Sequence, residues 1–149
     1  MNKTTIELIF DDECLMCNSF IASLDKFINN DIYLIRAYGS FKLFKTYNQE
    51  LAKKYVYLDK VSQSSIIAIS ESNCYIYSSA IIFLLSKSKS KLIIMLSLMI
   101  RRIPKCIRDN VYKIIANNRK RLGMRINTKQ SCVLKYENIM VQEQCKIYW

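Results

Sequence analysis

The first two thirds of the chain alternate between short segments typical of strands and longer segments typical of helices. Runs rich in β-branched residues predict strands, and apolar residues spaced three and four positions apart predict helices. The expected strands are 4–10, 32–37, 64–70 and 74–77, and the expected helices are 14–29, 41–54 and 78–85. A tight turn at 71–73 joins the last two strands, which predicts an antiparallel hairpin. The predicted order is therefore β-α-β-α-β-β-α.

More helix is expected in the remainder of the chain. The apolar run 92–100 predicts one helix, and Pro104 suits the first turn of another. An apolar stripe at helical spacing then leads to Gly123, which suits the position just past a helix end. The stripe consists of Ile107, Val111, Ile114, Ile115 and Leu122. The tail at 124–149 has a mixed pattern, with one short strand expected at 133–136.

The predicted order is the plan of the thioredoxin fold, in which a strand–helix–strand unit precedes a helix, a hairpin and a final helix. The chain has 149 residues, enough for one domain with a real core, and only two Gly and one Pro, which argues against long linkers. We therefore expect a single α/β domain over 1–149. It consists of a thioredoxin-like core at about 1–100 and a basic helical extension and tail at about 101–149.

Charge is distributed unevenly along the chain, whose formal net charge is +11. Residues 101–149 hold 12 of the 23 basic residues but only 3 of the 12 acidic ones. Such a basic region could contact nucleic acid, anionic lipid or an acidic protein, or it could be a solvated helix face. No aromatic stacking platform accompanies the basic run at 119–121, so nucleic-acid binding is not expected.

The sequence indicates a cytoplasmic location. The first five residues are polar, and the apolar run that follows is short and soon meets three acidic residues, unlike a secretory signal. The run 92–100 is too short to span a bilayer, which takes about 20 residues. In the cytoplasm the six cysteines should be mostly reduced, and any disulfide should be transient and catalytic. The roles of Cys74, Cys106, Cys132 and Cys145 stay open.

Cys14 and Cys17 lie where the first predicted strand gives way to the first predicted helix. At a helix start the two thiols share one face, and unpaired N–H groups and the helix dipole favour the thiolate. In the functional interpretation Cys14 attacks a disulfide and Cys17 is the resolving thiol. The alternatives are two inert core residues or half of a zinc site. Because the chain has no His and no second C-x-x-C, no metal or organic cofactor is expected.

Asp11, just before the dithiol, is the third candidate catalytic residue. A carboxylate there could accept or relay the proton that the resolving thiol must lose. Alternatively, Asp11 only shapes the turn into the helix, a position that Asp favours.

Three motifs together resemble the DCC-type thiol–disulfide oxidoreductases, a thioredoxin-like family. The first is the run from Asp11 to Asn18 with its two cysteines, and the second is Ser78-Ser79-Ala80. The third comprises Ile103, Pro104, Arg108, Asp109, Tyr112, Ala116, Arg119 and Gly123, and Cys132 resembles a Cys that many members carry just after it. The resemblance implies a thioredoxin-like fold, thiol–disulfide exchange at Cys14 and Cys17, and a shared structural or functional role for the supporting residues. These are Asn18, Ser78, Arg108, Asp109, Tyr112 and Arg119.

The chain departs from the family pattern at Asp12, where the family has Gly. The added negative charge would oppose formation of the Cys14 thiolate. We expect one Arg of the third motif to pair with Asp11 or Asp12 and offset this acidity. In the alternative, Arg119 and Asp109 tie their helix to the rest of the domain.

The segment before the third strand also differs from thioredoxin, which carries a cis-Pro there that faces the dithiol. This chain has no Pro in that segment, so Ser64 or Ser65 should take its place. The sequence therefore does not predict that a cis-Pro loop docks the substrate.

The expected function is thiol–disulfide exchange on a disulfide-containing protein or a small disulfide, with a reducing partner that the sequence leaves unknown. A cytosolic location favours the reductase direction. The alternative function is a non-catalytic interaction module that keeps the fold and binds an acidic partner through its basic C-terminal surface.

Overall fold

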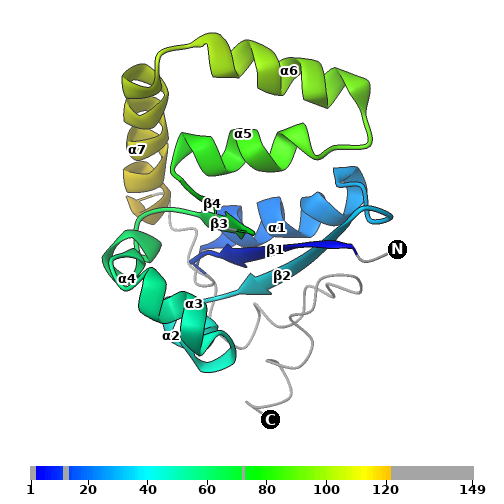
Figure 1. Ribbon diagram of the computed structural model, residues 1–149. Coiled ribbons are helices and arrows are strands. Elements are labelled where there is room, and N and C mark those ends of the chain that lie inside the picture. The colour runs from blue at the N-terminus through cyan, green and yellow to red at the C-terminus, as the bar shows by residue number, and fades with distance from the viewer. Residues whose placement is uncertain (1–2, 12–13, 72, 122–149) are drawn as a thin grey trace.

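A four-stranded mixed sheet forms the centre of the molecule (Figure 1). The computed structural model describes residues 3–11, 14–71 and 73–121. The strands are β1 (Thr4–Ile9), β2 (Tyr33–Tyr38), β3 (Ile67–Ser70) and β4 (Asn73–Ile76), and their order in the sheet is β2-β1-β3-β4. β1 runs parallel to β2 and antiparallel to β3, and β3 and β4 form an antiparallel hairpin.

Seven helices surround this sheet in the described part of the chain. They are α1 (Leu15–Phe27), α2 (Phe41–Tyr47), α3 (Gln49–Lys54), α4 (Leu58–Ser62), α5 (Ser78–Ser86), α6 (Lys91–Arg102) and α7 (Lys105–Arg121). α1 and α5 cover one face of the sheet, and α2 to α4 lie against the other. α6 packs on α5 on the side away from the sheet, and α7 runs past one end of both helices (Figure 1).

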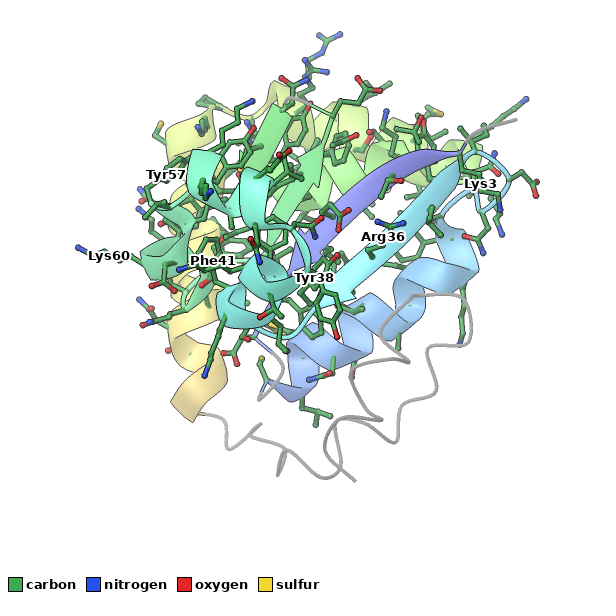
Figure 2. All side chains as sticks on the ribbon, turned by 60° about the horizontal axis from the view of Figure 1, so that its bottom comes forward. Lys3, Arg36, Tyr38, Phe41, Tyr57 and Lys60 are labelled. Atoms are coloured by element: carbon green, nitrogen blue, oxygen red, sulfur yellow. The ribbon has the colours of Figure 1, made fainter. Side chains whose placement is uncertain are left out.

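The pleat of the strands divides the core in two, because successive side chains point to opposite faces. Ile6, Leu8 and Phe10 face α1 and α5, where they form one buried cluster with Leu24 and Leu84. The second cluster lies under α2 to α4 and contains Ile9, Tyr38, Phe41, Phe44, Leu58, Ile67 and Ile69. Figure 2 shows Tyr38 at the end of β2, beside Phe41 at the start of α2.

This arrangement confirms the predicted α/β class and the thioredoxin-like order of strands and helices. One helix prediction is wrong, because 41–54 forms two helices that meet at Asn48. The backbone of Asn48 leaves the helical region (φ −131°, ψ 63°), and its side-chain amide donates a hydrogen bond of 2.8 Å to the Tyr38 hydroxyl. This tie to the sheet ends α2. The sequence analysis also missed α4, a single short helix whose Leu58 is buried in the second cluster.

The expectations for the tail lie outside the described residues. They concern Gly123 as a helix end, the strand at 133–136 and the surroundings of Cys132 and Cys145. Among the residues that the structure does describe, no helix combines the length and the apolar character that crossing a bilayer requires.

Candidate active site

Cys14 is the N-cap residue of α1 and lies directly after the loop that leaves β1. Its backbone is extended (φ −96°, ψ 113°), and its sulfur accepts a hydrogen bond of 3.4 Å from the backbone N–H of Cys17. The cysteine thus takes the place of the Ser, Thr or Asp side chain that usually caps a helix. The Cys14 sulfur therefore lies at the positive end of the helix dipole and is hydrogen-bonded to the backbone of Cys17. Both cysteines are free thiols.

Asn18 fixes the backbone of this cap. Its side-chain amide donates a hydrogen bond of 2.9 Å to the Cys14 carbonyl, and its backbone N–H donates to the same oxygen at 3.0 Å. The Asn18 side chain is almost fully buried. On the other side of the cap, the Cys14 N–H donates to the Asp11 carbonyl at 3.2 Å, and the Asp11 residue is half-buried. Asn18 and the Asp11 turn therefore set the position of the nucleophile candidate.

The dithiol lies at the edge of the first core cluster. Cys14 is 5% exposed and Cys17 is 3% exposed, and both belong to the cluster that contains Phe10, Ile66 and Ala80. The two residues between the cysteines, Leu15 and Met16, are exposed. The start of α1 is therefore apolar and exposed between two buried thiols.

The segment before β3 carries trans peptides, and no cis peptide bond occurs among the described residues. Ser64 is exposed, whereas Ser65 is buried and hydrogen-bonds the backbone around it. The Ser65 hydroxyl accepts from the Tyr77 N–H at 2.8 Å and donates to the Ile66 carbonyl at 2.9 Å. Ile66 shares the buried cluster of the dithiol. The two hydrogen bonds of the Ser65 hydroxyl to backbone groups thus brace the segment that leads into this cluster.

Two supporting residues of α7 reach this same region. The Tyr112 hydroxyl accepts a hydrogen bond of 2.9 Å from the Ile66 N–H, and the Asp109 carboxylate accepts one of 2.5 Å from the Ser78 hydroxyl. These contacts tie α7 to the start of β3 and to the first residue of α5. The sequence analysis raised such a tie as one alternative for Asp109, and the structure shows it.

Tyr77 has a backbone conformation that is rare for a residue with a side chain. Its φ is 54° and its ψ is −134°, a combination that costs free energy for any residue but Gly. The Ser65 hydroxyl binds its N–H, and its ring meets the Tyr112 ring edge-on with centroids 5.8 Å apart. Sequence reasoning missed Tyr77, because it belongs to no motif and no Gly marks the strained position. It named Ser65 only as one of two residues expected in the place of the cis-Pro.

The expected pairing of an Arg with Asp11 or Asp12 stays a prediction. Asp12 and the side chain of Arg119 lie outside the described residues, while the backbone of Arg119 belongs to α7. Arg108 is partly buried, and its Nε lacks a hydrogen-bond partner among the described atoms.

The other described cysteines lie apart from the dithiol. Cys74 packs against the second core cluster, on the opposite face of the sheet, and Cys106 is exposed on α7. Burial raises the pKa of the Cys74 thiol, and a hydrogen bond with Tyr57 opposes that rise. Within the described part of the chain, no three side chains of His, Cys, Asp or Glu gather as a metal site would require.

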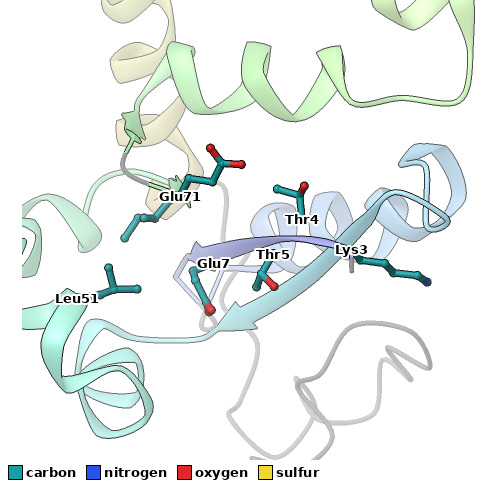
Figure 3. Close-up of a pocket in the computed structure, with 7 residues that line it drawn as sticks. Lys3, Thr4, Thr5, Glu7, Leu51 and Glu71 are labelled. Atoms are coloured by element: carbon teal, nitrogen blue, oxygen red, sulfur yellow. The ribbon is translucent and has the colours of Figure 1, made fainter. Parts of the chain in front are cut away.

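A shallow pocket of about 400 Å³ lies on the same opposite face, lined by residues of β1, β3 and α3 that include Glu7, Leu51 and Ile69 (Figure 3). One oxygen of the buried Glu7 carboxylate lies 3.7 Å from the Arg36 guanidinium. The other oxygen has no hydrogen-bond partner among the described residues. The sheet separates this pocket from the dithiol.

The fold and the site together define a thioredoxin-like protein with a dithiol at the start of its first helix. The model of one family, described as DCC1-like thiol-disulfide oxidoreductase, matches residues 8–125. The match spans the dithiol, Ser78 and the motif on α7, and it covers well over half of the chain. The chain therefore belongs to the DCC1-like thiol-disulfide oxidoreductase family, and membership indicates thiol–disulfide redox chemistry. No curated protein and no solved structure matches the chain.

Proposed function

We propose that this protein catalyses thiol–disulfide exchange with Cys14 as the nucleophile and Cys17 as the resolving thiol. The observation that carries the proposal is the hydrogen bond from the Cys17 N–H to the Cys14 sulfur at the start of α1. A donor aimed at the sulfur, together with the positive end of the helix, stabilises negative charge there. The thiolate is the form that attacks a disulfide.

The exchange takes two steps that balance in atoms and electrons. The Cys14 thiolate attacks one sulfur of the substrate disulfide, forms a mixed disulfide and releases the other substrate sulfur as a thiolate. Cys17 then loses its proton and attacks the Cys14 sulfur, which releases the second substrate thiolate. The dithiol ends as a Cys14–Cys17 disulfide, and the substrate has gained two electrons. A thiol reductant must return the protein to the dithiol form.

The position of Cys17 supports its place in the second step. Cys17 lies one helical turn after Cys14 and its N–H contacts the Cys14 sulfur, so its thiol can reach a mixed disulfide formed there. Asp11 is the proposed acceptor for the Cys17 proton, because it is half-buried in the turn that leads into Cys14.

Three variants test these roles, assayed by reduction of a small disulfide and by mass spectrometry of trapped adducts. Cys14→Ser should abolish activity, and Cys17→Ser should accumulate a mixed disulfide on Cys14. Cys106→Ser is the matched control, since it removes an exposed thiol that does not belong to the buried cluster of the dithiol and should leave the rate unchanged. If Cys14→Ser kept the full rate, or if Cys106→Ser lost it, the assignment would be wrong.

The low exposure of both thiols supports a second candidate function, the non-catalytic interaction module. In that case the family fold would carry a dithiol that no substrate reaches. Iodoacetamide treatment of the native protein separates the two functions. The redox function requires that iodoacetamide alkylates Cys14 selectively at a pH below about 8.5, which is the pKa of an ordinary cysteine thiol. The module predicts that iodoacetamide labels the exposed Cys106 but neither Cys14 nor Cys17 until the protein is unfolded.

A further inference from the structure

α6 has a half-buried side with Ile93, Ile94 and Ile100 and an opposite apolar side that is exposed. Its buried residue is Ser97, which is 1% exposed and donates a hydrogen bond of 2.7 Å to the Ile94 carbonyl. Leu92, Met95, Leu96 and Met99 are 78%, 60%, 51% and 68% exposed. Packing against the domain accounts for the half-buried isoleucines of α6 but not for these four exposed residues.

Four of the five exposed apolar residues of α6 form one stripe, hereafter the α6 stripe (Leu92, Met95, Leu96 and Met99). Their positions i, i+3, i+4 and i+7 place them within one narrow arc of the helix surface. α6 lies on α5 on the side away from the sheet (Figure 1), and the four side chains of the stripe are exposed there. A contiguous apolar surface of this kind is typical of a contact site.

The charge around the stripe selects the kind of partner. From residue 72 to residue 108 the sequence contains seven basic residues and no acidic one. Three of the seven, Lys91, Arg101 and Arg102, belong to α6 and are exposed. A second copy docked through α6 would bring these like charges together, whereas an anionic surface would be attracted to them.

We propose that α6 docks the protein on a membrane surface rich in anionic phospholipid, with the α6 stripe buried among the acyl chains and its basic residues among the phosphates. A helix that is apolar on one side, basic at its edges and too short to cross a bilayer lies in the interfacial plane. The docking is independent of the dithiol chemistry and leaves the N-terminus of α1 on another side of the molecule.

The test is co-flotation of the full chain with vesicles of phosphatidylcholine alone and of phosphatidylcholine mixed with phosphatidylglycerol. The wild-type protein should float with the anionic vesicles, and high salt should weaken this binding. Met95→Gln/Met99→Gln should lower the affinity at least about tenfold, because two exposed apolar side chains lose their place in the bilayer. Gln is a good helix former, so α6 itself should persist.

The basic residues are tested separately. Lys91→Gln/Arg102→Gln, at the edge of the α6 stripe, should weaken binding about 30-fold, since each basic residue near an anionic surface contributes about fivefold. Lys45→Gln/Lys53→Gln is the matched control, because it removes the same charge from exposed positions on α2 and α3. Cys14→Ser should float like the wild type.

Three results would overturn the proposal. The first is no flotation with anionic vesicles, and the second is equal loss in the α6 charge variant and its control. The third is a dimer by analytical ultracentrifugation that Met95→Gln/Met99→Gln dissociates, since a second copy would then cover the stripe.

Discussion

Tyr112→Phe should destabilise the protein because it leaves the buried backbone N–H of Ile66 without its hydrogen-bond acceptor. The substitution removes the hydroxyl that accepts the Ile66 N–H at 2.9 Å, while the ring that packs against Tyr77 remains. Ile66 is buried, so its N–H would lose its partner without gaining water. An unpaired buried donor costs about 1–3 kcal/mol of unfolding free energy. For a chain of this length, each kcal/mol lowers the melting temperature by about 2–4 °C.

Urea unfolding followed by circular dichroism measures this loss, and Tyr47→Phe on the surface of α2 is the matched control. Because Tyr47 is exposed, its variant should stay within about 0.5 kcal/mol of the wild type. A Tyr112→Phe variant as stable as the Tyr47→Phe control would refute the reasoning. It would show that the hydrogen bond between the Ile66 N–H and Tyr112 of α7 contributes nothing to the free energy of unfolding.

Three further predictions concern the core, a helix cap and the response to pH. Leu24→Ala in α1 removes a fully buried side chain and should cost about 2–5 kcal/mol in urea unfolding. Ser40→Ala removes the hydroxyl that caps α2 through the Leu43 N–H and should lower the urea midpoint by the equivalent of about 1 kcal/mol. Burial, reinforced by the Glu7 carboxylate, raises the pKa of Tyr38 above its ordinary value of 10.0. Above that pH the Tyr38 hydroxyl loses its proton in the unfolded chain but keeps it in the folded chain, so the free energy of unfolding should fall as pH rises. Tyr38→Phe should reduce the slope of this fall by the amount that corresponds to about one proton.

The site was predictable where local pattern and chemistry coincide. An apolar β-branched run followed by a helical pattern places Cys14 and Cys17 at a strand-to-helix junction, and the structure has them there. What the pattern could not supply is the surrounding network. Ser65 and Tyr77 come together only because the β3–β4 hairpin folds back on itself, and that contact depends on tertiary structure.

The last two helices show a second limit of periodicity. An apolar stripe predicts that α7 is a helix, but it does not say which side packs. The structure buries Ala116 and docks Asp109 and Tyr112, while Ile107 and Val111 of the stripe are exposed. α6 behaves in the same way, with Ser97 inside. The docking side of α7 is set by two hydrogen bonds and a small residue, and that of α6 includes a serine, features that a hydrophobicity pattern ranks low.

The central claim is that Cys14 and Cys17 form a working redox pair. Equilibration of the native protein in glutathione buffers of stepped potential, followed by acid quenching and mass-spectrometric mapping of disulfides, tests it most directly. The account predicts one two-electron transition that forms the Cys14–Cys17 disulfide and is absent from Cys14→Ser. Buffers that oxidise Cys106 but never yield a Cys14–Cys17 disulfide would contradict it.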